Sequence, residues 1–117
     1  MNNPLVNSGV HPNGESAIFI KVRNVKKSKA WYASAMGLLL DEHNRVQAFG
    51  INFVLYESQD LIPTAEPIIT FETEDLVFAY RSLSHNGVEL LDEPNTESDF
   101  FRFKDLDGNI MIMRSYK

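Results

Sequence analysis

Hydrophobic and polar positions alternate with a period of two between residues 16 and 23. Because successive side chains of a strand point to opposite faces, Ile18, Ile20 and Val22 would share one face of this segment. The other face would carry Ala17, Phe19 and Lys21. The pattern predicts a first strand whose two faces are used differently.

A helical pattern follows this strand. Asn24 is a residue type that caps helix N-termini, and Gly37 can end a helix in the left-handed conformation. Between them, apolar residues at helical spacing form a stripe of Trp31, Tyr32, Ala35, Met36 and Leu38. Three short strands are then predicted at residues 38–41, 46–50 and 52–57, separated by turn residues at His43-Asn44 and Gly50.

The second half of the chain repeats this plan. Residues 68–73 alternate again, Asp75 can cap a helix that Gly87 ends, and strands are predicted at 88–91, 100–104 and 110–115. The predicted helix would carry an apolar face of Leu76, Ala79, Tyr80 and Leu83. Superposing the halves places Ile18 on Ile69 and Asn24 on Asp75, 51 residues apart, and Gly37 on Gly87, 50 residues apart.

The repeat predicts an α+β fold of two tandem βαβββ modules whose curled mixed sheets enclose a cleft. We expect residues 1–15 to form a flexible N-terminal arm and residues 16–117 to form one domain. Within that domain, module one would span residues 16–57, a connector residues 58–67 and module two residues 68–117.

The Asp107-Gly108 pair predicts a tight turn between the last two strands. Asp105, Asp107 and Asn109 resemble the first ligands of a calcium-binding EF-hand loop, which also needs Gly at its sixth and Glu at its twelfth position. This chain has Ile110 and Tyr116 there, so we interpret the turn as structural.

Composition narrows the classes of function. Sixteen acidic and eleven basic residues give a net charge of −5, which disfavours binding to the phosphates of nucleic acid. The chain has no cysteine, which excludes disulfides, thiolate nucleophiles and sulfur-ligated metals. The first fifteen residues contain no apolar stretch long enough for a signal or a membrane span, so we expect a cytoplasmic location and no membrane partner.

Several short motifs carry a family resemblance that spans most of the chain. They are Val22-Arg23-Asn24-Val25, Ser28-Lys29-Ala30-Trp31-Tyr32 with Met36-Gly37-Leu38, and Phe103-Lys104-Asp105-Leu106-Asp107-Gly108-Asn109. With these motifs the chain resembles the vicinal oxygen chelate superfamily, which includes glyoxalase I, extradiol dioxygenases, fosfomycin-resistance enzymes and bleomycin-binding proteins. The family usually has Pro where this chain has Leu106. The resemblance implies a homodimer, often with the N-terminal arm reaching over the partner.

Metal-using members of that family place His or Glu ligands on the first and last strands of each module. The resemblance maps these positions to four apolar residues, Ala17, Val54, Ile68 and Ile112. An aliphatic side chain offers a divalent cation no donor atom, so we expect neither a metal nor another cofactor. A one-residue shift in register brings no His or carboxylate to these positions, and Glu57 would need a shift of three residues.

The open faces of the predicted sheets present an apolar floor with a few polar groups, which suits a small organic ligand. Besides Ala17 and Ile110, the candidate ligand-binding residues are Phe19, Lys21, Asn52, Val54, Tyr56, Ile68, Thr70, Glu72, Arg102, Ile112 and Arg114. Other roles stay open for several of them. Lys21 and Glu72 either pair or lie at the rim, Arg102 and Arg114 are either rim charges or clamps for a carboxylate, and Phe19 and Tyr56 form either a wall or a stacking platform.

Three functions follow from this pattern. The first is a metal-free member of the superfamily that binds a small organic or antibiotic-like molecule and sequesters it. The second is a lyase, isomerase or dioxygenase that holds metal in a non-standard way or uses Glu72 as a base, with Arg102 or Arg114 stabilising an oxyanion. The third is a sensor or interaction module whose cleft large side chains have filled.

Overall fold

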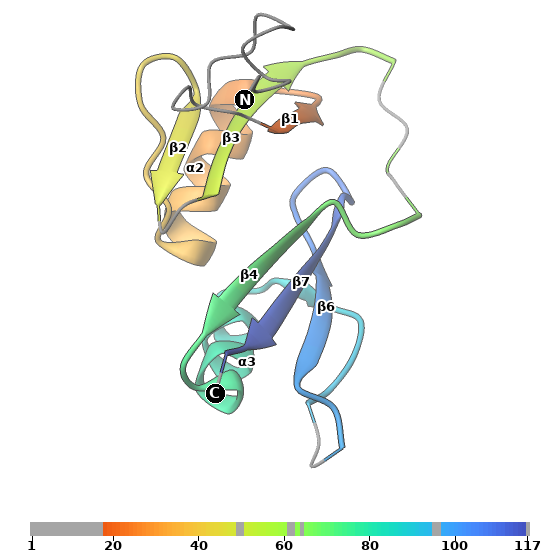
Figure 1. The fold of residues 1–117 in the computed structure, drawn as a ribbon. Helices are drawn as coiled ribbons and strands as arrows, with labels where there is room; N and C mark the ends of the chain where they lie inside the picture. Colours follow the sequence, from red (N-terminus) through yellow and green to blue (C-terminus); the bar gives the residue numbers. More distant parts are fainter. Residues whose placement is uncertain (1–17, 49–50, 61–62, 64, 95–96, 117) are drawn as a thin grey trace, which may run out of the picture.

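The computed structural model describes residues 18–48, 51–60, 63, 65–94 and 97–116 of the chain. They form two modules, one above the other in Figure 1. The N-terminal module contains β1 (Ile18–Val22), α2 (Val25–Met36), β2 (Arg45–Ala48) and β3 (Ile51–Glu57). The C-terminal module contains β4 (Ile69–Thr73), α3 (Leu76–His85), β5 (Glu89–Leu90), β6 (Phe100–Lys104) and β7 (Ile110–Ser115).

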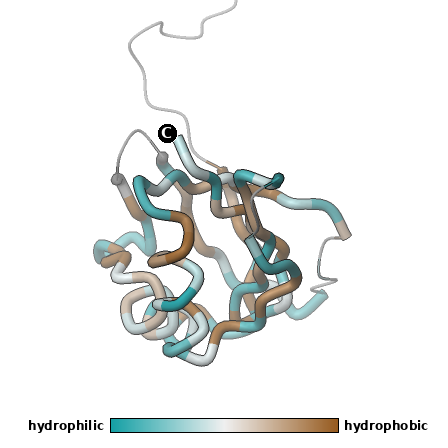
Figure 2. The backbone as a smooth tube through the Cα atoms, turned by 90° about the horizontal axis from the view of Figure 1, so that it is seen from below, coloured by the Kyte–Doolittle hydropathy of each residue, from teal (hydrophilic) through white to brown (hydrophobic). Residues whose placement is uncertain are grey.

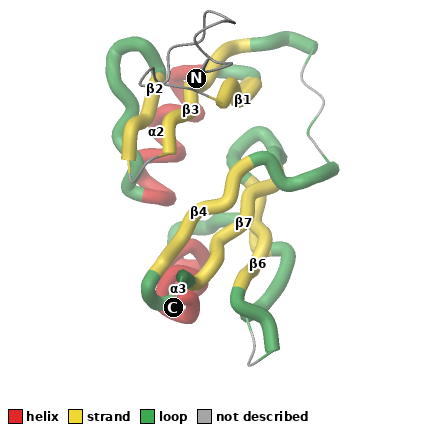
Figure 3. The backbone as a smooth tube through the Cα atoms, viewed as in Figure 1, coloured by secondary structure: helices red, strands yellow, loops and turns green. Residues whose placement is uncertain are grey.

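The two sheets share the arrangement of three strands, and the second sheet has a fourth. The first has the order β1-β3-β2, with β1 parallel and β2 antiparallel to β3. The second has the order β4-β7-β6-β5, with β4 parallel and β6 antiparallel to β7. Each sheet has one helix beside it (Figure 3). The predicted α+β fold and its internal repeat are therefore confirmed.

Local signals in the sequence set the ends of both helices. The Asn24 side chain accepts a hydrogen bond from the Lys27 N–H at 3.0 Å, and the Asp75 side chain accepts one from the Phe78 N–H at 3.0 Å. Gly37 ends α2 with φ 69°, and Gly87 follows α3 with φ 79°. Both glycines adopt the left-handed conformation that a side chain would disfavour. None of the described helices is long and apolar enough to cross a membrane.

The prediction of a strand at residues 38–41 is wrong, because these residues are described and form no strand. The Leu38 N–H donates to the Tyr32 carbonyl at the end of α2, so the helix cap uses it. The Asp41 side chain then accepts hydrogen bonds from the N–H groups of His43 and Arg45, which closes a tight turn. These local hydrogen bonds satisfy backbone N–H groups of this segment without pairing it to a neighbouring strand.

The helix-covered faces of both sheets share one core. In β1 the alternation leaves Ile20 and Val22 buried, as the period of two predicted. Aromatic rings connect the modules, since Phe53 of β3 contacts Phe71 of β4 at a centroid distance of 6.3 Å. Within the N-terminal module, Tyr32 of α2 contacts Phe53 at 5.5 Å. Figure 2 shows hydrophobic and hydrophilic stretches alternating along the chain, in keeping with sheets that bury one face. The core therefore spans both modules.

The opposite faces of the sheets, which we call the open faces, are not closed against each other in the single chain. Phe19 is 65% exposed and Tyr56 is 38% exposed on the first sheet. Thr70, Glu72 and Arg114 are exposed on the second. Burial of the helix-covered faces holds the two modules together. It leaves the open faces available for another molecule.

A buried polar cluster joins the modules at the turn between β6 and β7. Asp105 Oδ2 accepts a hydrogen bond from the Tyr32 hydroxyl at 2.7 Å, and Asp107 Oδ2 accepts one from the Ser28 hydroxyl at 2.8 Å. Asp107 Oδ1 also accepts from the Arg23 N–H at 2.9 Å, and Asn109 Nδ2 donates to the carbonyl oxygen of Lys21 at 3.1 Å. The turn of one module is thus bound to the first strand and helix of the other.

The same turn is stabilised from within. Asp105 Oδ1 accepts hydrogen bonds from the N–H groups of Asp107 and Asn109, both at 2.9 Å. Every carboxylate oxygen of Asp105 and Asp107 therefore has a protein donor, in agreement with a structural turn. Burial raises the pKa of Asp105 against the opposing effect of these bonds, and burial followed by the Asp105 charge raises the pKa of Tyr32.

We predict that Tyr32→Phe lowers the free energy of unfolding by about 1–3 kcal/mol, because it removes one donor from a buried carboxylate. Urea denaturation measures this change. Tyr116→Phe is the matched control, since Tyr116 is 53% exposed and donates to Glu74 at the surface. A Tyr32 variant as stable as the Tyr116 variant would contradict the role of this cluster.

Candidate functional site

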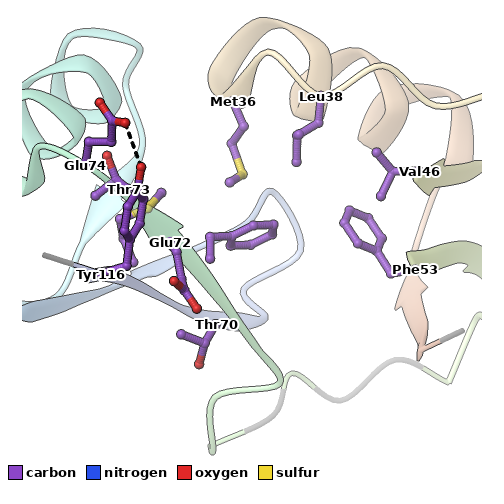
Figure 4. Close-up of a pocket in the computed structure, with 11 residues that line it drawn as sticks. Met36, Leu38, Val46, Phe53, Thr70, Glu72, Thr73, Glu74 and Tyr116 are labelled. Atoms are coloured by element: carbon purple, nitrogen blue, oxygen red, sulfur yellow. Dashed lines mark hydrogen bonds between the residues drawn. The ribbon is translucent and has the colours of Figure 1, made fainter. Parts of the chain in front are cut away.

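A cavity of about 810 Å³ lies between the two modules. We call it the intermodule pocket. The N-terminal module contributes Met36 and Leu38 at the end of α2, Val46 of β2 and Phe53 of β3. The C-terminal module contributes Thr70, Phe71, Glu72, Thr73, Glu74, Met113 and Tyr116. In Figure 4 the labelled residues of the N-terminal module lie on one side of the cavity and those of the C-terminal module on the other.

The pocket has an apolar floor and an acidic rim. Phe53, Phe71 and Met113 are buried core residues, whereas Glu72 and Glu74 are exposed. At the rim the Tyr116 hydroxyl donates a hydrogen bond to Glu74 Oε1 at 2.7 Å (Figure 4). This bond, followed by burial and the charges of Glu74 and Glu72, raises the pKa of Tyr116. Because its charged side chains are Glu72 and Glu74, the rim is acidic.

The structure brings together the candidate residues of the N-terminal module on its open face. The strand register pairs Phe19 with Val54 and Lys21 with Tyr56. The rings of Phe19 and Tyr56 meet edge to face, with a centroid distance of 5.9 Å and an interplanar angle of 77°. Asn52 lies on the same strand as Val54, and its buried Oδ1 accepts no hydrogen bond from a residue that the structure describes. We call these five residues the first open-face patch.

The candidate residues of the C-terminal module form a second group. The register pairs Thr70 with Ile112, Glu72 with Arg114, and Arg102 with Ile112, so they lie side by side on three strands. Ile68 precedes β4, and its N–H donates to the Ile110 carbonyl. Ala17 lies outside the described residues. Of all the candidates, only Thr70 and Glu72 also line the intermodule pocket.

The nine other lining residues of the pocket were not among the candidates. Among them, Phe53, Phe71 and Met113 lie on strands at positions whose alternation predicts core, and they are buried. Nothing in the sequence indicates that the two cores leave a gap where they meet. Tyr116 follows the last predicted strand, and its hydrogen bond to Glu74 depends on the tertiary structure.

Arg102 already has a partner within its own module. Its Nε and Nη2 atoms bind the two carboxylate oxygens of Asp92 at 2.8 Å and 3.0 Å, and its backbone N–H also donates to Asp92. Hydrogen bonding to Arg102 holds the pKa of Asp92 below its ordinary value of 3.8. Pairing of Lys21 with Glu72 is one expectation from the sequence. Among the described residues, these two form no ion pair with each other.

The residues at the family's metal positions do not fit a metal ion. Val54 lies in β3 and Ile112 in β7, while Ile68 directly precedes β4, and all three side chains are aliphatic. Within the described part of the chain, no group of three or more His, Cys, Asp or Glu side chains is arranged to hold a metal ion. His43 lies in the turn after α2 beside Glu42, and His85 is the last residue of α3.

Comparison with known proteins identifies the family. The model of the Glyoxalase/Bleomycin resistance protein/Dioxygenase superfamily matches residues 16–112. The chain belongs to this superfamily. Among curated proteins, this superfamily member is 44% identical over 48 residues to the uncharacterized protein YetH of Bacillus subtilis (strain 168). That match covers 39% of this chain and only 40% of YetH.

Solved structures agree with this assignment. The fosfomycin resistance protein FosX from Listeria monocytogenes superposes with a TM-score of 0.74 and 16% identity, covering 92% of this chain and 96% of FosX. TnmS3, an antibiotic binding protein from Streptomyces sp. CB03234, superposes with a TM-score of 0.66 and 21% identity, covering 90% of this chain and 98% of TnmS3. At these identities the likeness establishes the shared superfamily fold.

We predict that Asp92→Asn destabilises the protein at pH 7 and that the difference from wild type shrinks at acidic pH. Because the folded-state pKa of Asp92 is lowered, its contribution is present above pH 3.8 and is lost as the pH falls through the lowered pKa. Urea denaturation at a series of pH values measures this. Glu93→Gln, an exposed neighbouring charge, is the control. An equal loss of stability at every pH would contradict a charge-based contribution.

Proposed function

We propose that this protein binds a small organic molecule without using a metal ion and sequesters it stoichiometrically. The observation that carries the proposal is the set of hydrocarbon side chains at the family's metal positions: Ala17, Val54, Ile68 and Ile112. A divalent cation needs oxygen, nitrogen or sulfur donors, which these residues lack. The proposed function is therefore retention of a ligand rather than its activation by a metal.

The first open-face patch supports this proposal. Phe19 of the edge strand β1 and Tyr56 of the central strand β3 expose aromatic surface side by side, and folding alone gives no reason to expose it. Aromatic rings bind flat or apolar ligand surfaces and lose little conformational freedom in doing so. Lys21, which is exposed beside them, supplies a polar contact that orients a small ligand.

The class of ligand is suggested by the structural relatives. TnmS3 is described as an antibiotic binding protein and FosX as a fosfomycin resistance protein. We therefore propose an antibiotic-like organic molecule as the ligand. A homodimer remains our prediction, because a second copy would cover the exposed open faces and could complete a cleft around the ligand.

The test is isothermal titration of protein pretreated with a chelator against a panel of cationic glycopeptides and aromatic acids. We predict saturable binding of at least one panel member, with chelation leaving its affinity unchanged. Val54→Asp should weaken this binding about tenfold or more, because it buries a charge beneath the ligand. Val77→Asp makes the same change at an exposed position of α3 and should have no effect.

Two results would contradict the proposed function. One is a stoichiometric divalent metal in the purified protein whose removal abolishes binding. The other is chemical conversion of the bound panel member, which would favour a lyase, isomerase or dioxygenase. Elemental analysis and chromatography of the ligand after incubation detect these outcomes.

A further inference from the structure

We propose that the intermodule pocket is a second ligand site, which shares only Thr70 and Glu72 with the open faces, and that it selects organic cations with an apolar body. The cavity volume of about 810 Å³ lies within the range of roughly 300–1,000 Å³ that is typical of small-molecule sites. Nine of its eleven lining residues belong to neither open-face group. The site does not depend on the function proposed above.

The graded exposure of the lining gives the pocket a defined interior and mouth. Phe53, Phe71 and Met113 at the floor are between 0% and 9% exposed. Met36 and Leu38, which form the wall from α2, are half-buried. A ligand that covered these two side chains would remove apolar surface from water, and the flexible Met36 side chain can adapt to its shape.

The charges at the mouth have one sign. Glu72 and Glu74 are the charged residues among the described lining, and Thr70 and Thr73 add neutral hydroxyl groups. Arg114 is in register with Glu72, but it does not line the pocket. The Tyr116 hydroxyl already donates to Glu74, which leaves carboxylate oxygens to face a bound cation.

Charge and shape together specify the occupant. An anion would meet two carboxylates at the mouth, whereas a cation would be attracted by both. A small hydrated cation would gain nothing from the apolar floor, so the favoured ligand joins a positive charge to a hydrophobic body. Aromatic rings in the lining add to the preference for a cation.

The test uses two probe ions of nearly equal size and shape and opposite charge, tetraphenylphosphonium and tetraphenylborate. Their affinities for the full chain are measured by isothermal titration at low and at high salt. We expect tetraphenylphosphonium to bind more tightly and its advantage to decrease at high salt, because the rim charges are exposed and screened. Equal affinity of both ions, or tighter binding of the borate, would overturn the proposal.

Two pairs of variants locate the site. Glu72→Gln combined with Glu74→Gln should reduce the preference for the phosphonium about fivefold or more, since each exposed charge contributes only modestly. Glu93→Gln removes an exposed charge elsewhere and should leave the preference unchanged. Leu38→Trp should weaken binding of the phosphonium about tenfold by filling the cavity, whereas Leu39→Trp, at a position 80% exposed, should not.

The variants also separate this site from the open-face site. Val54→Asp should leave phosphonium binding unchanged, and Leu38→Trp should leave binding of the aromatic acids of the panel unchanged. If Leu38→Trp instead alters the oligomeric state measured by light scattering and leaves ion binding intact, the pocket is an interface with a second copy and the proposal fails. Loss of phosphonium binding in the Val54 variant would likewise overturn it.

Discussion

The buried hydrogen bonds around the turn between β6 and β7 are the constraint on which the rest of the structure depends. Asp105 and Asp107 are nearly inaccessible to water, and such carboxylates are tolerated only where donors surround them. Three of those donors come from the other module: Arg23, which follows its first strand, and Ser28 and Tyr32 of its helix. The two modules are therefore held in one relative position by directional bonds as well as by the apolar core.

This arrangement determines which surfaces remain for function. Because the turn and the ring contacts between Phe53 and Phe71 hold the helix-covered faces together, each sheet keeps its open face toward solvent. The same packing leaves the intermodule pocket where the end of α2 approaches β4. Two surfaces of different chemistry result, one with an aromatic pair and few polar groups and the other with an apolar floor and an acidic mouth.

The superfamily fold supports several kinds of chemistry, because the residues on its sheets vary independently of the packing that holds the modules together. The family resemblance maps the metal positions of metal-using members to Val54, Ile68 and Ile112, whose aliphatic side chains carry no donor atoms. Leu106 replaces the usual Pro of the turn and is exposed, so the hydrogen bonds of Asp105 and Asp107 do not depend on that residue. Membership of the superfamily therefore does not by itself require a metal site.

The sequence by itself determined the elements, the duplication and the faces of the strands, because periodicity, helix caps and turn glycines act locally and do not require the partner module. It also indicated that Asp105 and Asp107 serve the turn. It predicted a strand at residues 38–41 that the structure does not have. There the backbone forms a helix cap and a turn closed by the Asp41 side chain, in spite of its β propensity. Only the tertiary structure paired Arg102 with Asp92, bound Tyr32 to Asp105 and opened the intermodule pocket, because these depend on contacts between residues far apart in the chain.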